Sequence, residues 1–303
     1  MNIKLSLPIF FLMFSGIIAC NAQKPMKNMY PILENISVNA NIPYKNIDGT
    51  TLELDVYYPA EKLGEEPWDK LSENKKPTLI YFHGGGWVEG DRTSRFLNLL
   101  PFLEKDWCVV NVDYRLLDQT HVLGCLNDCI DAINWVKNNA EKYKFNLDKI
   151  YLSGESAGGH LALLAGMRDS FEDADNFVHN KEIPIAGIIN WYGITHMQSA
   201  IDFWNDSGYT KMILDPWKGD GQIYLDLTSP INHVTASTPP ILTIHGDADV
   251  NVEFEQASSF HKALEAKKVK NELIRIPGKK HGNFSAEELE MAFESIWKFY
   301  SID

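Results

Sequence analysis

The chain has 303 residues, of which 45% are hydrophobic and 23% are charged. Such a composition is that of a globular protein, and the length suits either one large α/β domain or two ordinary ones. The formal charge of −13 at pH 7 disfavours nucleic acid and anionic membrane surfaces as partners, because both repel an acidic protein.

The first twenty residues differ from the rest of the chain. Lys4 precedes an apolar run over residues 5–18, and Ala19 and Cys20 follow. This order is typical of an export signal, and the run is short for a membrane-spanning helix. Residues 17–20 also resemble a bacterial lipobox, so we expect a lipid anchor on Cys20 as the only membrane contact. A plain secretory signal with an incidental Cys20 is the alternative.

Strand-like and helical segments alternate along the remainder. Residues 42–47 and 51–58 flank Asp48-Gly49, which indicates a hairpin, and the polar residues 61–76 indicate a surface loop. The clearest helix covers residues 122–143, with one apolar face. Further strand-like runs cover residues 78–82, 107–112, 149–152, 184–189, 241–245 and 272–276. This alternation predicts the α/β class, with a mostly parallel sheet covered by helices on both faces.

The predicted organisation has three parts: a signal over residues 1–20, a tether over 21–40 and a single domain over 41–303. Residues 195–237 interrupt the alternation and are rich in aromatic side chains, so we expect a small insertion over the sheet. The protein would then be an exported cell-envelope protein that faces the periplasm or the outside.

Three cysteines remain besides Cys20, namely Cys108, Cys125 and Cys129. We interpret them as small core residues, although the spacing of Cys125 and Cys129 also permits a disulfide. They lack histidines at zinc-finger spacing, so the sequence implies no metal.

A pentapeptide at the end of a predicted strand carries the first chemical signal. Gly154-Glu155-Ser156-Ala157-Gly158 fits G-x-S-x-G, with a strand before it and a helical pattern after it. In that context Ser156 lies on a sharp turn that exposes its hydroxyl as a nucleophile. The alternative is a serine that only caps the following helix.

A glycine-rich segment supplies the second signal. His83-Gly84-Gly85-Gly86-Trp87 follows the predicted strand 78–82. Ester and amide cleavage creates an oxyanion, which backbone N–H groups stabilise best where no Cβ blocks their approach. We therefore assign the N–H groups of Gly85, Gly86 and Ala157 to an oxyanion hole, and His83 to a hydrogen bond that fixes the loop.

A serine nucleophile needs a base and an acid, which follow a G-x-S-x-G turn in the order acid, then histidine. His281 lies in the loop after the predicted strand 272–276 and is the candidate base. His261 falls in a helical run and is expected at the surface, and His245 is expected to be structural. Asp247 and Asp249 compete for the acid, and Asp249 is preferred as the residue that orients the imidazole.

Together these motifs resemble those of the hormone-sensitive-lipase-like esterases, within the α/β-hydrolase fold. VDYRL at residues 112–116 adds to the likeness, which runs from about residue 42 to the C-terminus. The nearest branch is that of the bacterial and fungal feruloyl-esterase-type enzymes (acetyl esterases and lipases). This resemblance implies the catalytic residues Ser156, Asp249 and His281. Two departures are residues 250–252, where members often show Val-Pro, and residues 117–125, which lack the usual Pro-Ala-Ala-Leu run.

We therefore expect a serine carboxylic ester hydrolase that needs no cofactor and acts on a small-molecule or oligosaccharide ester. Feruloyl or acetyl groups on plant polysaccharide such as xylan are the expected substrates. An amide hydrolase of the formamidase or peptidase type, with the same triad, is the alternative, and a non-catalytic binding protein on this fold is a further one. Trp87 is assigned to substrate binding, with the core as its alternative, whereas the other tryptophans are expected in the core.

Overall fold

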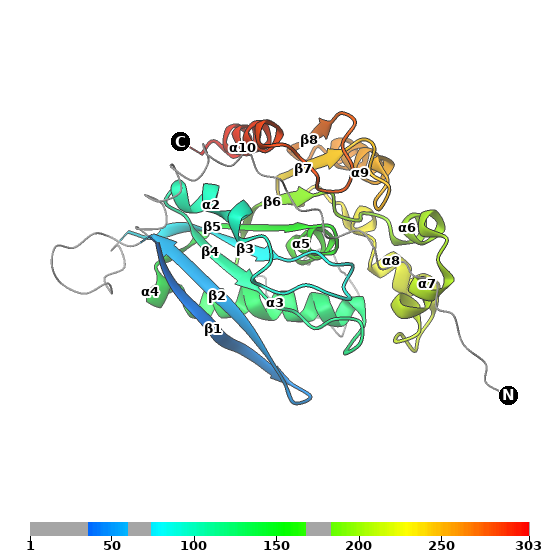
Figure 1. Cartoon of the computed structure of the whole chain (residues 1–303), viewed down its shortest axis with the longest axis horizontal. Coiled ribbons are helices and arrows are strands. Elements are labelled where there is room, and N and C mark those ends of the chain that lie inside the picture. Colours follow the sequence, from blue (N-terminus) through cyan, green and yellow to red (C-terminus); the bar gives the residue numbers. More distant parts are fainter. Residues whose placement is uncertain (1–35, 60–73, 168–182, 303) are drawn as a thin grey trace. The chain divides into compact units, whose positions relative to one another are not determined.

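The computed structural model describes residues 36–59, 74–167 and 183–302, which belong to one compact unit over residues 35–303. Eight strands form one sheet in the order β1-β2-β4-β3-β5-β6-β7-β8 (Figure 1). The strands are β1 (Ile36–Ile47), β2 (Thr50–Pro59), β3 (Lys76–Phe82), β4 (Cys108–Val112), β5 (Phe145–Glu155), β6 (Ile185–Trp191), β7 (Ile241–Gly246) and β8 (Asn271–Ile276). The predicted signal at 1–20, including Cys20, and most of the predicted loop at 61–76 lie outside the described residues.

The sheet combines an antiparallel edge with a parallel centre. β1 pairs with β2 and β2 with β4 in antiparallel fashion, whereas the strands from β4 through β3 to β8 run parallel. The expected α/β-hydrolase fold with an N-terminal hairpin is confirmed. The hairpin turns at Asp48 and Gly49, both with positive φ. β1 begins at Ile36, so residues 36–40 of the predicted tether are instead a strand that hydrogen-bonds to β2.

The helices are α2 (Phe96–Glu104), α3 (Val122–Asn138), α4 (Ala140–Tyr143), α5 (Ala157–Gly166), α6 (Met197–Trp204), α7 (Ser207–Leu214), α8 (Gly221–Leu227), α9 (Phe254–Ala266) and α10 (Ala286–Tyr300). The helix expected over 122–143 divides at Asn139, whose φ of −109° is outside the helical range. None of the helices in the described ranges combines the length and the apolar character that crossing a membrane requires.

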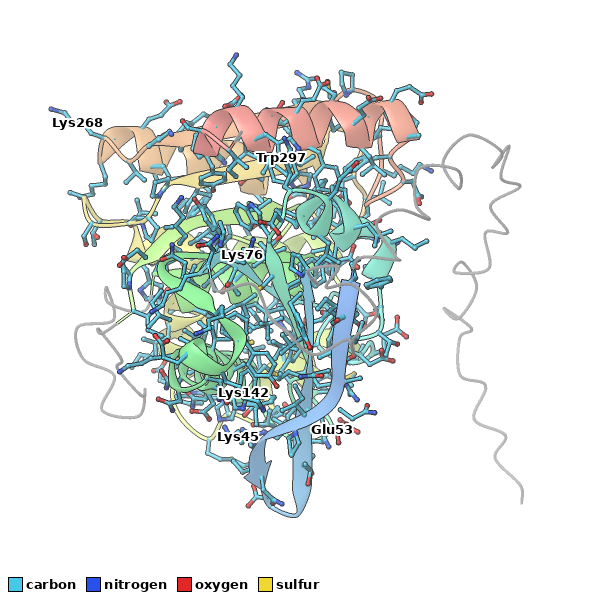
Figure 2. The ribbon with its side chains drawn as sticks, turned by 90° about the vertical axis from the view of Figure 1, so that its left-hand side faces the viewer. Lys45, Glu53, Lys76, Lys142, Lys268 and Trp297 are labelled. Atoms are coloured by element: carbon cyan, nitrogen blue, oxygen red, sulfur yellow. The ribbon has the colours of Figure 1, made fainter. Side chains whose placement is uncertain are left out.

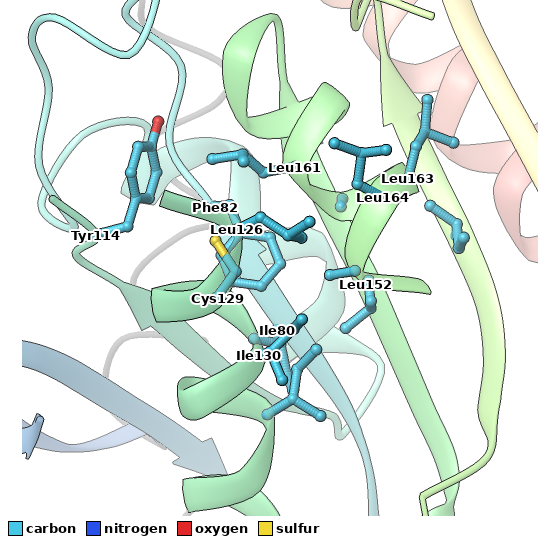
Figure 3. Packing of buried hydrophobic residues seen from close by; sticks show 14 of the residues in the cluster. Ile80, Phe82, Tyr114, Leu126, Cys129, Ile130, Leu152, Leu161, Leu163 and Leu164 are labelled. Carbon is cyan, nitrogen blue, oxygen red and sulfur yellow. The ribbon is translucent and has the colours of Figure 1, made fainter. Parts of the chain in front are cut away.

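Alternate residues of the central strands face two separate layers. On one face, strand side chains pack against α3 and α5 in a continuous buried cluster that extends to α9. Figure 3 shows part of it, with Ile80, Phe82, Leu126, Cys129, Ile130, Leu152, Leu161, Leu163 and Leu164. Cys108, Cys125 and Cys129 are buried and unoxidised, as expected for small core residues.

The other face of the sheet is covered by α2 and α10 through aromatic contacts. Trp297 of α10 lies 5.0 Å from Phe102 of α2, and Tyr300 lies 5.2 Å from Tyr151 of β5, measured between ring centroids. In Figure 2, Trp297 lies at the opposite end of the sheet from Lys45 and Glu53 of the hairpin. The sheet is thus enclosed on both faces, so reactive side chains are accessible only in the loops at the ends of its strands.

The segment expected as an insertion contains α6, α7, α8 and a 3₁₀ turn, Pro230–His233. In Figure 1 these helices gather beside the ends of the strands. Asp206 and Asp220 begin α7 and α8, because each carboxylate accepts hydrogen bonds from two backbone N–H groups of the first helical turn.

Candidate active site

Ser156 occupies the turn between β5 and α5. Its backbone has φ 53° and ψ −119°, a combination that a non-glycine residue adopts only under strain. The Ser156 N–H donates to the carbonyl of Trp191, 2.9 Å away, and its own carbonyl accepts from the N–H of His160 at 3.0 Å. These two bonds hold the turn in place. Ser156 is half-exposed, whereas residues 150–155 and 157–165 are buried.

Gly154 and Gly158 of the pentapeptide lie where the turn leaves no room for a side chain. A Cβ on Gly154 would lie 2.4 Å from the backbone of Gly158. A Cβ on Gly158 would lie 2.0 Å from the carbonyl oxygen of Phe82 and 2.4 Å from that of His83. Only glycine lets β3, β5 and α5 approach this closely.

The structure brings His281 and Asp249 to Ser156 from two other loops. His281 Nε2 lies 2.9 Å from Ser156 Oγ, and His281 Nδ1 lies 2.7 Å from Asp249 Oδ2. With its hydrogen on Nδ1, His281 donates to Asp249 and accepts from the Ser156 hydroxyl. The Asp249 side chain is fully buried, whereas that of His281 is 14% exposed.

Asp249 is held as a carboxylate. Burial acts to raise its pKa, but hydrogen bonds with His245 and His281 and with the backbone outweigh burial, so the pKa lies far below its usual range. Oδ1 accepts from the N–H groups of Asn251 and Val252 at 2.8 and 3.0 Å. The carboxylate is therefore ionised and fixed in orientation at neutral pH.

His245, expected to be structural, has a role beside Asp249. Its Nε2 lies 2.9 Å from the Val252 carbonyl and 3.3 Å from Asp249 Oδ2. Both partners are acceptors, so Nε2 carries a hydrogen. Asp247, the competing acid, instead pairs with Arg275 at 2.7 Å and accepts from the Gly278 N–H at 2.5 Å, away from His281.

The three expected oxyanion donors lie on segments next to Ser156. Gly85 and Gly86 are half-exposed and have φ of 111° and 60°, values that favour glycine. Ala157 is the first residue of α5, so its N–H has no partner within the helix. The His83 imidazole contacts the Gly84 carbonyl at 2.7 Å and stacks on Tyr114, which agrees with its expected role in fixing this loop.

Two expectations need correction. Trp87 is 0% exposed and packs edge-on against His160, with ring centroids 5.1 Å apart, so it belongs to the core and is not available as a substrate contact. The backbone of Trp87 has φ 60°, and the side chain turns inward at that bend. His261 is not at the surface: it is 4% exposed, because α9 turns it towards β8, where Nδ1 bonds to Asn271 at 2.7 Å.

A buried polar group beneath the nucleophile was not anticipated. Tyr192 donates to Glu155 Oε2 at 2.6 Å, and Arg95 Nε bonds to Oε1 at 2.9 Å. The Tyr192 ring also lies edge-on to His281, 4.6 Å between centroids. Burial, with the negative charge of Glu155, raises the pKa of Tyr192 well above its usual value, so its hydroxyl stays a donor. The position of Glu155 directly before Ser156 was a signal in the sequence. Its partners are 37 and 60 residues away along the chain, so the sequence alone does not identify them.

The arrangement contains the parts that nucleophilic acyl transfer requires: a hydroxyl, an imidazole, a buried carboxylate and free amides. Within the described residues, no group of three or more His, Cys, Asp or Glu side chains is arranged to hold a metal ion.

Comparison with known proteins agrees with this reading of the fold. A family model described as BD-FAE matches residues 54–264, more than half of the chain. The chain belongs to the BD-FAE family. Membership of BD-FAE confirms the predicted likeness to α/β-hydrolase esterases.

This BD-FAE chain is also similar to individual proteins. It is 30% identical over 236 residues to the esterase LipC of Mycobacterium tuberculosis, covering 74% of this chain and 57% of LipC. It is 26% identical over 240 residues to an isoprenylcysteine alpha-carbonyl methylesterase of Arabidopsis thaliana, covering 75% of this chain and 53% of that protein. The chain thus spans about half the length of these curated relatives. A truncated carbohydrate esterase from gut microbiota shares the fold, with a TM-score of 0.72 and 21% identity over 88% of this chain and 96% of that one.

Proposed function

We propose that this protein is a serine carboxylic ester hydrolase in which Ser156 is the nucleophile, His281 the general base and Asp249 the residue that orients His281. One observation carries the proposal: Ser156 Oγ, the His281 ring and Asp249 form a continuous hydrogen-bonded series at 2.9 and 2.7 Å. The relatives named as esterases support the same class of reaction.

In the proposed mechanism, Ser156 Oγ attacks the ester carbonyl carbon while His281 Nε2 accepts the hydroxyl proton. Asp249 stabilises the imidazolium that results, since it is ionised and bonded to Nδ1. The C–O bond of the ester then breaks, and His281 returns the proton to the departing alcohol. Water, deprotonated by His281, then attacks the acyl carbon. The bond from that carbon to Ser156 Oγ breaks, the acid is released, and His281 returns the proton to Ser156 Oγ.

The carbonyl oxygen becomes negatively charged in both steps. The N–H groups of Gly85, Gly86 and Ala157 are proposed to stabilise it. Each such donor is worth about 2.7–4 kcal/mol in the transition state. The start of α5 also favours negative charge at this point, because the amide dipoles of the helix are aligned there.

For the substrate we propose a feruloyl or acetyl ester on plant polysaccharide such as xylan. The BD-FAE match and the likeness to a carbohydrate esterase support this choice. The proposed location is the cell envelope, where a lipid on Cys20 anchors the protein. Incorporation of a radiolabelled fatty acid, lost in Cys20→Ser, would test it.

The reaction class and the acyl group are tested in two assays. The chain without residues 1–20 is given p-nitrophenyl acetate and the matching anilide, with Ser156→Ala as the blank. Ester turnover that disappears in Ser156→Ala supports the proposal, and faster cleavage of the anilide makes the protein an amide hydrolase. Feruloylated, acetylated arabinoxylan oligosaccharides are then supplied, and released ferulate and acetate are measured together.

A further inference from the structure

Two aromatic residues of the insertion hydrogen-bond to the two loops that flank Ser156. Trp204 ends α6 and Tyr209 lies in α7, and their rings meet edge to face, 5.0 Å apart at 62°. Tyr209 Oη donates to the Gly86 carbonyl at 2.8 Å, and Trp204 Nε1 donates to the Asn251 carbonyl at 2.7 Å. The pair thus connects the glycine-rich loop with the loop that carries Asp249.

The contact to Gly86 adds a restraint to a loop in which the Gly85 carbonyl already accepts from the N–H groups of Val88 and Glu89, at 3.0 and 3.1 Å. Gly85 and Gly86 both have positive φ and no side chain to restrain them. The Tyr209 hydroxyl fixes the direction of the Gly86 carbonyl and so holds the peptide unit between Gly86 and Trp87. This unit directly follows the one that carries the Gly86 N–H, a proposed oxyanion donor, so holding it limits rotation at Gly86. A Cβ on Gly86 would lie 2.8 Å from the Tyr209 hydroxyl, so the two groups are closely fitted. Burial raises the pKa of Tyr209, and its hydroxyl therefore remains a donor at any working pH.

The contact to Asn251 acts on the acid. The Asn251 N–H donates to Asp249 Oδ1 at 2.8 Å. Trp204 holds the carbonyl of the same residue, although Asn251 itself is exposed. An exposed loop residue is thereby anchored on one side to the carboxylate and on the other to the insertion.

We propose that Trp204 and Tyr209 form an aromatic clamp of positioning residues, which keeps the oxyanion donors and Asp249 in register across Ser156. The clamp rests on the proposed function. The insertion, whose helices lie beside the ends of the strands (Figure 1), thereby also positions residues of the active site. The clamp acts on turnover rather than on binding, because neither hydrogen bond is needed to hold the substrate in its ground state.

The test compares Tyr209→Phe, Trp204→Phe and the double variant with two matched controls. Tyr300→Phe removes the same kind of bond far from the site, a hydroxyl that donates to the Ile188 carbonyl at 2.7 Å. Trp217→Phe removes an indole N–H bond to the Asp220 carbonyl within the same insertion. Each protein is titrated with a fluorophosphonate that labels serine, and kcat on p-nitrophenyl acetate is expressed per labelled site, so that loss of folded protein does not count.

Each single clamp variant should lower kcat about five- to tenfold, with KM within about twofold, as expected for the loss of one positioning hydrogen bond. The double variant should lose less than the product of the single losses, since the rings are in contact. Clamp variants whose kcat per site equals that of Tyr300→Phe and Trp217→Phe would overturn the clamp. If Ser156→Ala keeps wild-type turnover, the proposed function itself fails, and the clamp with it.

Discussion

Acid should destabilise the protein in part through His160, four residues after Ser156. The side chain is fully buried in α5, with Nε2 2.7 Å from the Thr228 carbonyl. Burial lowers the pKa of His160 from 6.5 to about 4. The folded protein therefore keeps His160 neutral at pH values where the unfolded chain binds a proton.

The direction and the size of the change in stability with pH follow from this difference in pKa. The stabilisation is fully present above pH 6.5 and is lost as the pH falls through the interval from 6.5 to about 4. The complete loss is about 3.4 kcal/mol, at about 1.36 kcal/mol per pH unit, and about 2.4 kcal/mol of it falls between pH 7 and pH 4.5. The free energy of unfolding of a typical protein is about 5–15 kcal/mol, so this loss is a large part of it.

Urea unfolding at pH 7 and pH 4.5 measures this loss, with His160→Gln as the comparison. Glutamine does not titrate and keeps an N–H that can donate to the Thr228 carbonyl. Groups that do not interact with His160 contribute equally to both losses. The charge of His233 also acts on His160, so the difference between the two losses measures His160 together with this coupling. The wild type should lose about 2.4 kcal/mol more than the variant. Equal losses in the two proteins would refute the reasoning.

Two further substitutions test the site and its scaffold. Asp249→Asn should lower kcat about 10⁴-fold, because an amide does not stabilise the imidazolium. Steady-state kinetics beside Asp247→Asn, expected near wild type, checks this, and a loss below about tenfold would contradict it. Gly158→Ala should lower the melting temperature by several degrees, since its Cβ would crowd the Phe82 carbonyl oxygen. Gly221→Ala, with open space around it, should leave that temperature near the wild-type value, and equal values for the two variants would argue against the crowding.

The catalytic candidates could be located from sequence because each lies at a strand end with a distinctive neighbourhood. Ser156 is surrounded by glycines that only a crowded turn requires, and His281 follows the last strand. Parallel strands deliver their carboxyl ends to one edge of a sheet, so these residues meet without knowledge of any side-chain contact. Asp249 is preferred over Asp247 from the sequence alone, and in the structure Asp247 turns towards Arg275 instead.

Other features depend on packing that periodicity does not encode. Trp87 follows three glycines, and its burial depends on a positive φ that a sequence pattern does not reveal. His261 is expected at the surface from its place in a helical run, whereas α9 packs against β8 on that side. The contact between Tyr209 and Gly86 joins residues 123 positions apart, and it depends on how the short helices of the insertion fold.

The most direct test of the account is a search for the acyl-enzyme. The chain is mixed with p-nitrophenyl acetate, quenched in acid within milliseconds and digested, and the peptides are examined by mass spectrometry. The proposed mechanism predicts one acetyl group per chain, on Ser156, with a burst of p-nitrophenol that Ser156→Ala lacks. Turnover that continues in Ser156→Ala, or acetyl groups on other residues with Ser156 unmodified, would contradict it.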